Sequence, residues 1–314
     1  MGSLTGAKIP LIDFTTDDLN PGSSSWVCVC RDLCSALEEY GFFIAKYDEV
    51  SSRLNEAIFG VSKELFHLPT DIKIKNVNSK PFLGYHGQLA ARPLYESFGI
   101  DYVTDKEQVH EFTNTMWPSG NSDFSETVYL YSKVMKQLHE KVVRMIFDNY
   151  GVDKYYESNK EATTYLLRFL KYRAPQENES NKGLLPHTDK SFLTILHQNH
   201  VNGLEVKAKN GEWISLDFAP SSTFVVMAGE AIMGWSNDRI DACEHMVTMK
   251  FKETRYSLGL FSFIKGIIQV PEELIDEEEH PLKYKPFDHV GMLHFFATAE
   301  GRHHQRTLKA YCGL

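Results

Sequence analysis

The sequence predicts an α+β fold in which helices pack against a β-sandwich or jelly-roll core. Helical periodicity dominates the first half of the chain, and short β-rich segments separated by turn signals dominate the second half. A length of 314 residues and a hydrophobic content of 42% suffice for one large core or two closely packed ones. We therefore divide the chain into a helical and mixed N-terminal region at residues 1–120 and a β-rich domain at residues 121–314, which carries a supporting helix and a C-terminal helix.

Two amphipathic helices with a short strand between them are predicted near the N-terminus. Possible N-caps at residues 23–25 and a closing glycine, Gly41, bound the first helix. Residues 42–45 are apolar and short enough for a buried strand, and Pro69 should end the second helix. The apolar positions that define the two helical faces are Trp26, Cys30, Leu33, Leu37 and Tyr40 for the first and Leu54, Ala57, Ile58, Val61 and Leu65 for the second.

The middle of the chain divides into an irregular part and a long helix. Residues 76–121 are rich in Gly, Pro and aromatic residues without a clear period, which predicts an extended segment with short strands. Residues 128–147 keep one apolar face over several turns, and Gly151 ends the run. This face predicts a helix and consists of Tyr131, Val134, Met135, Leu138, Val142, Met145 and Ile146.

The second half of the chain predicts a series of short strands. They lie at residues 165–167, 192–196, 203–206, 213–214, 223–226 and 256–263. The dipeptides Asn202-Gly203 and Asn210-Gly211 are turn signals between them, at the spacing of a sandwich or jelly roll. A last amphipathic helix is predicted near residues 290–296.

Charge and apolar content narrow the choice of partner and compartment. A formal net charge of -9 without clustered Lys and Arg argues against nucleic-acid binding and favours a small neutral or cationic partner. No apolar run is long enough to span a bilayer, and the first fourteen residues lack the features of a secretory signal. We therefore expect a cytoplasmic protein without membrane contact, and we take it as a monomer.

The cysteines predict free thiols rather than disulfides or a metal cluster. Five is an odd number, and no secretory signal accompanies them. Cys28, Cys30 and Cys34 could be ligands of a metal, but Cys30 and Cys34 share a predicted helical face with Leu33 and Leu37. The interpretation that they pack as small hydrophobic side chains is the better one.

Three residues in the β-rich half form a candidate metal site. His187 and Asp189 flank one residue, so on an extended backbone both side chains would point the same way. A jelly roll can bring a later strand with His245 beside them. Two imidazoles and one carboxylate make the facial triad of non-haem Fe(II) oxygenases, which leaves coordination positions open for small ligands. One His-x-Asp is expected by chance in a chain with 13 His, so the pattern needs the second histidine to carry weight.

A second pair of polar residues follows His245 along the chain. Arg255 and Ser257 alternate on a predicted strand and could face the same cavity. A guanidinium binds a carboxylate through two parallel hydrogen bonds, and a neighbouring hydroxyl can add a third. The alternative interpretation is an ordinary strand arginine paired with a surface glutamate.

Taken together, these motifs resemble the plant soluble Fe(II)- and 2-oxoglutarate-dependent dioxygenases over nearly the whole chain. The chain is most similar to the branch that contains glucosinolate side-chain oxygenases, a lignan ring-closing dioxygenase and steroidal glycoalkaloid hydroxylases. Thr188-Asp189-Lys190 and Lys285-Pro286-Phe287 are local similarities to that branch. The landmarks that match in order and spacing lie at residues 9–14, 39–43, 187–189, 193–196, 203–206, 235–237 and 255–257.

The resemblance implies a double-stranded β-helix (jelly roll) core and a role for each site residue. His187, Asp189 and His245 would bind iron, and Arg255 and Ser257 would hold the distal carboxylate of 2-oxoglutarate. Tyr172 matches a tyrosine that hydrogen-bonds the cosubstrate near the metal. The chain departs from the family pattern at Leu170, Lys171 and Met246, where Asn, Tyr and Arg are usual, and these departures weaken the assignment of Tyr172.

The reaction implied by the resemblance oxidises a small specialised metabolite. O2 and 2-oxoglutarate are consumed, succinate and CO2 are released, hydroxylation is the expected outcome, and ascorbate supports activity. Several aromatic groups could wall the substrate pocket, although about half of such side chains usually fill the core. The candidates are residues 82–86, Met116, Trp117, Phe261, Phe263, Phe295 and Phe296.

Two other functions are compatible with the same residues. An oxidase on this scaffold could take electrons from ascorbate or from its substrate and need no 2-oxoglutarate, and Arg255 and Ser257 do not exclude it. A non-enzymatic jelly-roll protein could bind a small molecule, and a broken triad would be its best support. A cosubstrate assay separates the first alternative from the dioxygenase.

Overall fold

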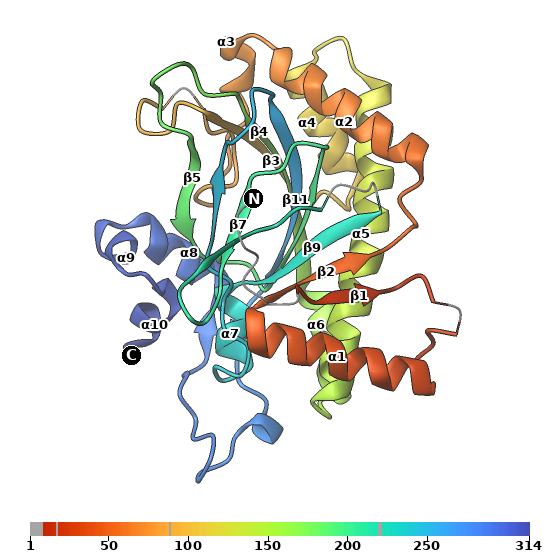
Figure 1. Cartoon of the computed structure of the whole chain (residues 1–314), viewed down its shortest axis with the longest axis vertical. Helices are drawn as coiled ribbons and strands as arrows, with labels where there is room; N and C mark the ends of the chain where they lie inside the picture. The colour runs from red at the N-terminus through yellow and green to blue at the C-terminus, as the bar shows by residue number, and fades with distance from the viewer. Residues whose placement is uncertain (1–8, 17, 88, 219–221) are drawn as a thin grey trace, which may run out of the picture.

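The computed structural model describes residues 9–16, 18–87, 89–218 and 222–314. Two sheets form the core: a seven-stranded sheet in the order β1-β2-β9-β6-β11-β4-β3 and a four-stranded sheet in the order β5-β10-β7-β8 (Figure 1). A two-stranded sheet, β12-β13, lies apart from them in the strand order. The strands are β1 (Leu11–Asp13), β2 (Phe42–Lys46), β3 (Tyr95–Asp101), β4 (Thr163–Tyr172), β5 (Lys182–His187), β6 (Leu193–Gln198), β7 (Leu204–Lys207), β8 (Trp213–Ser215), β9 (Thr223–Ala228), β10 (His245–Thr248), β11 (Arg255–Ile264), β12 (Ile267–Ile268) and β13 (Phe287–Asp288).

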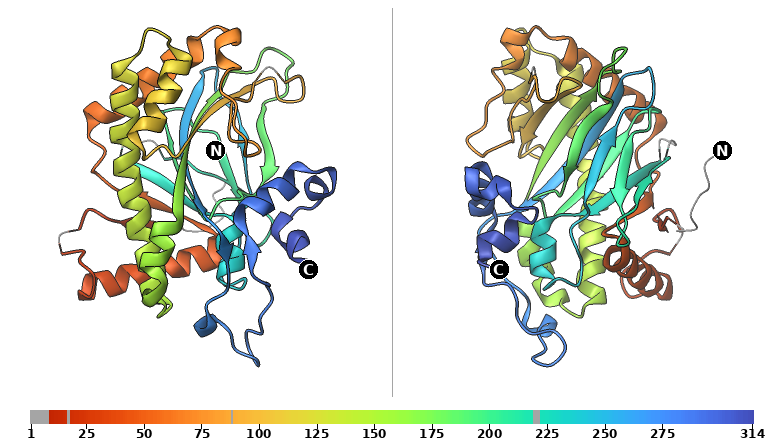
Figure 2. Two further views of the ribbon diagram at one scale, coloured as in Figure 1. Left: turned by 180° about the vertical axis from the view of Figure 1, so that it is seen from behind. Right: turned by 60° about the vertical axis from the view of Figure 1, so that its left-hand side comes forward.

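Helices flank these sheets on two sides. The C-terminal helices α8 to α10 lie on the opposite side of the molecule from α5 in Figure 1 and in the left-hand view of Figure 2. The α-helices are α1 (Ser24–Tyr40), α2 (Ser52–His67), α3 (Thr70–Lys73), α4 (Lys106–Met116), α5 (Ser122–Asn149), α6 (Tyr156–Ala162), α7 (Glu230–Trp235), α8 (His289–Ala297), α9 (Ala299–His303) and α10 (Thr307–Cys312), and 3-10 turns form at Asp153–Tyr155 and Glu272–Leu274. This is the α+β architecture with a jelly-roll core that the sequence predicts.

The seven-stranded sheet has two different apolar faces. Leu167 and Phe169 on β4 belong to the large core that the N-terminal helices complete, whereas Leu170 and Tyr172 belong to a separate apolar cluster. Successive side chains on a strand point to opposite faces of the sheet, so the second pair faces the interior between the sheets. The candidate site residues on β4 and β11 can therefore share one interior space.

The predicted helices form where their caps and apolar faces indicate. Ser23 caps α1 by accepting a hydrogen bond from the backbone N–H of Trp26 at 3.1 Å. Gly41 ends α1 at a φ of +74°, and a Cβ there would lie 2.9 Å from the carbonyl oxygen of Asp241. The long helix α5 extends the predicted 128–147 in both directions, and Gly151 follows its C-cap at a φ of +67°. These outcomes confirm the helix predictions.

The expectation of an extended segment with short strands at residues 76–121 was wrong in part. Strand β3 lies there, but helix α4 follows it. Asp105 caps α4 through the N–H of Glu107, and Val109, Phe112 and Met116 face the core. These three positions keep helical spacing, but one short helix among irregular segments is a weak periodic signal.

The C-terminal region also holds more structure than expected. Helix α8 confirms the helix predicted near residues 290–296, but it is apolar nearly all round rather than amphipathic. It is not the last helix, because α9 and α10 follow. Leu308 and Cys312 of α10 are buried. The end of the chain is therefore part of the packed structure.

Strands from the N-terminal region belong to the same sheet as the β-rich half. Strand β2 pairs in antiparallel register with β9, and β3 pairs with β4. The sheet thus crosses residue 120, where we placed the boundary between the two regions. That division stays a prediction.

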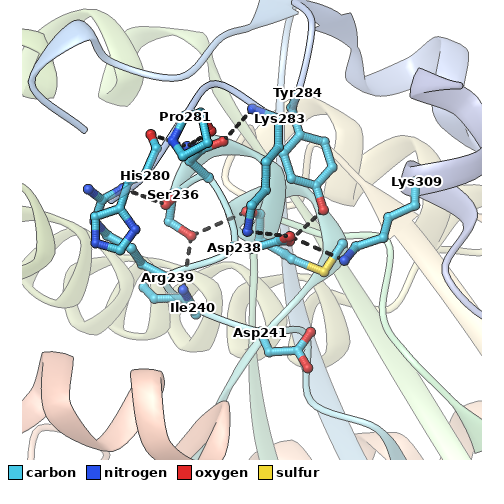
Figure 3. A network of polar contacts seen from close by, with 12 residues as sticks. Ser236, Asp238, Arg239, Ile240, Asp241, His280, Pro281, Lys283, Tyr284 and Lys309 are labelled. Atoms are coloured by element: carbon cyan, nitrogen blue, oxygen red, sulfur yellow. Dashed lines mark hydrogen bonds and ion pairs between the residues drawn. The ribbon is translucent and has the colours of Figure 1, made fainter. Parts of the chain in front are cut away.

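A polar network anchors the segment between β12 and β13 (Figure 3). Asp238 accepts a hydrogen bond from Tyr284 Oη at 2.5 Å, and the ammonium groups of Lys283 and Lys309 lie 3.3 and 3.2 Å from its carboxylate. Asn237 receives the backbone N–H of Lys283 at 2.9 Å. Asn237 of the family landmark therefore ties the end of α7 to this segment, and the neighbouring Asp238 ties it to α10 as well.

The cysteines are free thiols, as the sequence analysis predicts. Cys30 and Cys34 are buried on α1, Cys28 is exposed, and all five cysteines are free. None of the described helices is both long and apolar enough to cross a membrane.

Candidate metal centre

Strand pairing brings the two predicted histidines together. In the antiparallel ladder between β5 and β10, His187 lies directly opposite His245, and their ring centroids are 4.2 Å apart. Asp189 follows β5, and its Oδ1 lies 3.7 Å from His187 Nε2 and 3.9 Å from His245 Nε2. One potential ligand atom from each residue lies within 4.8 Å of the others, and these three are the one such cluster among the described residues.

The imidazoles are oriented for metal binding by their own backbone. His187 Nδ1 lies 2.9 Å from the carbonyl oxygen of Leu185, and His245 Nδ1 lies 3.1 Å from that of Cys243. If each Nδ1–H donates to its carbonyl, each Nε2 keeps a lone pair that points toward Asp189. Metal-binding histidines are held by this kind of bond. Desolvation and the neighbouring His245 lower the pKa of His187, which favours its neutral, ligating form.

The environment of the Asp189 carboxylate indicates that a cation binds to it. Its Oδ2 is buried and has no hydrogen-bond partner among the described residues. A buried carboxylate oxygen without a partner is costly unless a proton or a cation satisfies it. The donor set of two imidazole nitrogens and one carboxylate suits Fe(II).

A buried ionic network that the sequence analysis missed supports the loop with Asp189. Glu230 accepts hydrogen bonds from Thr188 Oγ1 at 2.6 Å and from Lys190 Nζ at 2.7 Å. The backbone N–H of Glu230 donates to the carbonyl of Asp189 at 2.8 Å. On the other side, His289 Nε2 lies 2.6 Å from the carbonyl oxygen of Lys190. In the sequence, the charged Lys190 directly after the His187-Thr188-Asp189 motif is the one sign of this buried network.

The predicted carboxylate-binding pair is buried and pre-oriented. Arg255 is 1% exposed, and its guanidinium donates to Ser257 Oγ at 3.0 Å and to Gln198 Oε1 at 2.9 and 3.2 Å. No described carboxylate forms an ion pair with Arg255, so the alternative of a surface Arg–Glu pair is wrong. A buried guanidinium with neutral partners fits an anionic ligand. The sequence analysis missed Gln198.

Tyr172 lies beside this arginine. It is opposite Arg255 in the register of β4 and β11, and the guanidinium carbon is 5.3 Å from its ring centroid. Burial raises the pKa of Tyr172, so its hydroxyl stays protonated and can donate a hydrogen bond. Of the departures from the family pattern, Leu170 joins the interior cluster and Lys171 faces Glu96 on the outer side.

The aromatic candidates for a pocket wall divide between two places. Phe82 packs 5.1 Å from Phe296 and 6.2 Å from His86, measured between ring centroids. Phe261 and Phe263 adjoin a small apolar cluster with Leu83, Leu166 and Leu293. By contrast, Met116 and Trp117 pack in or against the large core on the other face of the sheet.

Comparison with known proteins decides the family. The model of the 2OG-Fe(II) oxygenase superfamily matches residues 162–264, and a model described as non-haem dioxygenase in morphine synthesis N-terminal matches residues 9–120. A probable 2-oxoglutarate-dependent dioxygenase of Arabidopsis thaliana, AOP1.2, is 43% identical over 315 residues, covering 98% of this chain and 96% of the relative. The chain belongs to the 2OG-Fe(II) oxygenase superfamily.

Solved structures of other 2OG-Fe(II) oxygenases share this fold. The dioxygenase for auxin oxidation of rice is 26% identical, with a TM-score of 0.81 over 96% of this chain and 99% of that one. Its Arabidopsis thaliana counterpart, solved with 2-oxoglutarate bound, is also 26% identical, with a TM-score of 0.78 over 87% of this chain and 100% of that one.

Family membership confirms the predicted enzyme class. The protein is a 2-oxoglutarate-dependent dioxygenase, with Fe(II) as its cofactor and 2-oxoglutarate and O2 as cosubstrates. Relatives from Arabidopsis thaliana such as AOP1.2 and AOP3 are named 2-oxoglutarate-dependent dioxygenases, which speaks against the 2-oxoglutarate-independent oxidase.

Proposed function

We propose that His187, Asp189 and His245 hold Fe(II) and that Arg255 and Ser257 bind the distal carboxylate of 2-oxoglutarate. Tyr172 donates a hydrogen bond to the same cosubstrate. The enzyme hydroxylates a small specialised metabolite and releases succinate and CO2. The observation that supports this most is the meeting of three ligand atoms within 4.8 Å around an unpartnered oxygen of Asp189.

The chain's own residues bind and orient the reactants. Bound iron supplies the redox chemistry that couples oxidative decarboxylation of 2-oxoglutarate by O2 to oxidation of a substrate C–H bond. Gln198 and Ser257 hold the guanidinium of Arg255 in place before the ligand arrives, which lowers the cost of binding. Burial excludes water from this pair and strengthens its attraction for a carboxylate.

Access to the centre is asymmetric. The side chains of Asp189 and His245 are only 9% and 6% exposed, whereas that of His187 is 33% exposed. The substrate and O2 therefore approach from the side of His187. The ion pair of Glu230 and Lys190 lies on the buried side of the centre. It holds in place the loop that carries Asp189, which we call the ligand loop.

A cosubstrate assay tests the function. Purified protein is supplied with Fe(II), ascorbate, 2-oxoglutarate and a panel of candidate specialised metabolites, and succinate and oxidised product are measured together. We expect succinate release that depends on 2-oxoglutarate and matches the amount of hydroxylated product. Turnover of a substrate without 2-oxoglutarate would contradict the proposal, and stimulation by ascorbate is a further expectation.

We also propose a cytoplasmic monomer that binds neither nucleic acid nor membranes. Five free cysteines suit a reducing compartment, and the net charge of -9 opposes binding to phosphate backbones. Light scattering coupled to size-exclusion chromatography tests the monomer, and cell fractionation tests the compartment. A dimer mass or a membrane-bound fraction would contradict the respective part.

A further inference from the structure

Arg168 on β4 is a second buried arginine, and the metal and cosubstrate sites do not use it. It is 7% exposed and shares the inward face of β4 with Leu170 and Tyr172, since side chains alternate along the strand. Tyr172 lies further along β4 on this same face, and the guanidinium of Arg168 reaches the backbone carbonyl groups of Phe82 and Gly84. Arg168 therefore lies between the cosubstrate pocket and the aromatic cluster of Phe82 and Phe296.

The partners of Arg168 are all neutral. Its Nη1 donates to Ser97 Oγ at 2.7 Å, and its Nη2 donates to the carbonyl oxygens of Phe82 and, at 3.4 Å, of Gly84. Within residues 9–16, 18–87, 89–218 and 222–314, no carboxylate forms an ion pair with it. These three hydrogen bonds go to a hydroxyl and to two backbone carbonyl groups, so none of them neutralises the charge of the guanidinium.

Two other largely buried cations among the described residues have a counterion. Lys190 pairs with Glu230 at 2.7 Å, and Lys73 pairs with Glu96 at 2.7 Å. Buried charges are generally paired because an unpaired charge away from water is costly. Arg255 lacks a carboxylate too, but 2-oxoglutarate would supply one. Arg168 has no such partner assigned.

With Fe(II) and 2-oxoglutarate bound, the charge of Arg168 would be the one that no neighbouring group neutralises. Ferrous iron and the guanidinium of Arg255 would be neutralised by the carboxylate of Asp189 and the two carboxylates of 2-oxoglutarate. The pair of Lys190 and Glu230 is neutral by itself. An anionic substrate would therefore complete the balance in the interior, where water screens charges poorly.

The side chains around Arg168 indicate that the part of the ligand next to its anionic group is apolar. In the sheet register, glycines lie opposite it on both neighbouring strands, Gly99 on β3 and Gly259 on β11. A Cβ on Gly259 would lie 2.6 Å from the ring of Phe261, and one on Gly99 would overlap the carbonyl oxygen of Leu83. The two glycines thus let Phe261 and the segment around Leu83 approach the guanidinium. These groups belong to the apolar cluster with Phe263 and Leu293.

We propose that Arg168 binds an anionic group of the primary substrate, a carboxylate or a related oxyanion, whose apolar part packs against the cluster of Phe261, Phe263 and Leu293. This inference rests on the proposed function, because it assigns the substrate class of the same site. It departs from the expectation of a neutral or cationic partner, which came from the net charge. The local field of one buried guanidinium outweighs the charge of a distant surface.

Matched acid and amide pairs test the proposal. The probes are 3-phenylpropanoate, indole-3-propanoate and 4-phenylbutanoate, each with its amide, and the sulfonate of the first. Binding is measured anaerobically by calorimetry on protein loaded with Fe(II) and 2-oxoglutarate, so the readout does not need turnover. We expect at least one acid to bind about tenfold or more tightly than its amide, the factor of one charge-assisted hydrogen bond. The sulfonate distinguishes a carboxylate site from a general oxyanion site.

Three variants separate charge recognition from loop support. Arg168→Gln should remove the preference for the acid, and Arg168→Lys should keep part of it. Lys171→Gln is the matched control, because it removes a positive charge from the outer face of the same strand, and the preference should persist. If Arg168→Gln weakened acid and amide equally, or if the wild type preferred no acid, the proposal would be overturned.

The same preparations separate this inference from the proposed function. A wild type that binds no 2-oxoglutarate would overturn the proposed function and this inference with it. A wild type that binds 2-oxoglutarate but does not distinguish acids from amides would overturn this inference alone. If Arg168→Gln weakened 2-oxoglutarate binding as much as Arg255→Ala does, Arg168 would serve the cosubstrate instead, which also contradicts the proposal.

Discussion

The carboxylate of Glu230 lies 2.7 Å from the ammonium group of Lys190; Glu230 is fully buried, and the side chain of Lys190 is 10% exposed. The other oxygen of Glu230 accepts the backbone N–H of Leu308 in α10 at 2.6 Å. The shape of the ligand loop is therefore coupled to a helix at the far end of the chain. Lys190 also lies 4.7 Å from the ring centroid of Phe296, which extends the contact to α8.

Glu230→Ala should destabilise the fold and weaken iron binding. The substitution leaves Lys190 buried without a counterion, which costs about 3–5 kcal/mol in the free energy of unfolding. Urea denaturation measures the stability, and titration with Fe(II) under anaerobic conditions measures the affinity. Glu253→Ala is the control, because its partner His200 is exposed and the loss should stay below about 1 kcal/mol. Equal effects of the two variants would show that the network does not support the loop.

His187→Ala should abolish iron retention and turnover while the fold stays largely intact. It removes one of three ligands, and no other described side chain is positioned to replace it. Iron content after desalting, succinate release and circular dichroism are measured together. His200→Ala removes an exposed histidine and should retain iron. Full iron content and turnover in His187→Ala would refute the assignment of the centre.

Arg255→Ala should raise the requirement for 2-oxoglutarate steeply. Loss of a buried, hydrogen-bonded charge pair costs about 2–5 kcal/mol, or roughly thirtyfold or more in affinity. The dissociation constant and the KM for 2-oxoglutarate are measured. Arg173→Ala removes an arginine that forms a surface pair with Glu179 and should change neither value much. An unchanged requirement in Arg255→Ala would move the cosubstrate site elsewhere.

Acidification below about pH 6.5 should destabilise the protein partly through His139. Burial lowers the pKa of His139 from 6.5 to about 3, so below 6.5 the unfolded chain binds a proton that the native state does not. The contribution of the neutral, buried His139 to the free energy of unfolding is fully present above pH 6.5. It is lost as the pH falls toward 3, by about 1.4 kcal/mol per pH unit.

The variant His139→Gln isolates this contribution. Free energies of unfolding are measured by urea denaturation at pH 7.5, 6.0 and 5.0 for both proteins. Below pH 6.5 the variant should lose stability with a slope smaller by about 1.4 kcal/mol per pH unit. Other titrating groups are common to both proteins and cancel in the comparison. Equal slopes would show that His139 does not titrate as its burial implies.

Local periodicity explains which elements could be predicted. Helices α1, α2 and α5 present one apolar face over several turns, and their caps lie close by in the sequence. Helix α4 was missed because its apolar face consists of only three residues, Val109, Phe112 and Met116. Helices α9 and α10 are short and were likewise missed, since short helices are stabilised mainly by tertiary packing.

The sequence by itself determined the residue types and spacing of the chemistry: His187, Asp189 and His245, followed by Arg255 and Ser257. A strand alternates its side chains, so this information is local. Only the tertiary structure decided that Gln198 orients Arg255, that Glu230 supports the ligand loop, and that Arg168 has no described counterion. Those relationships depend on strand register and on burial, which join residues far apart in the chain and which no local pattern encodes.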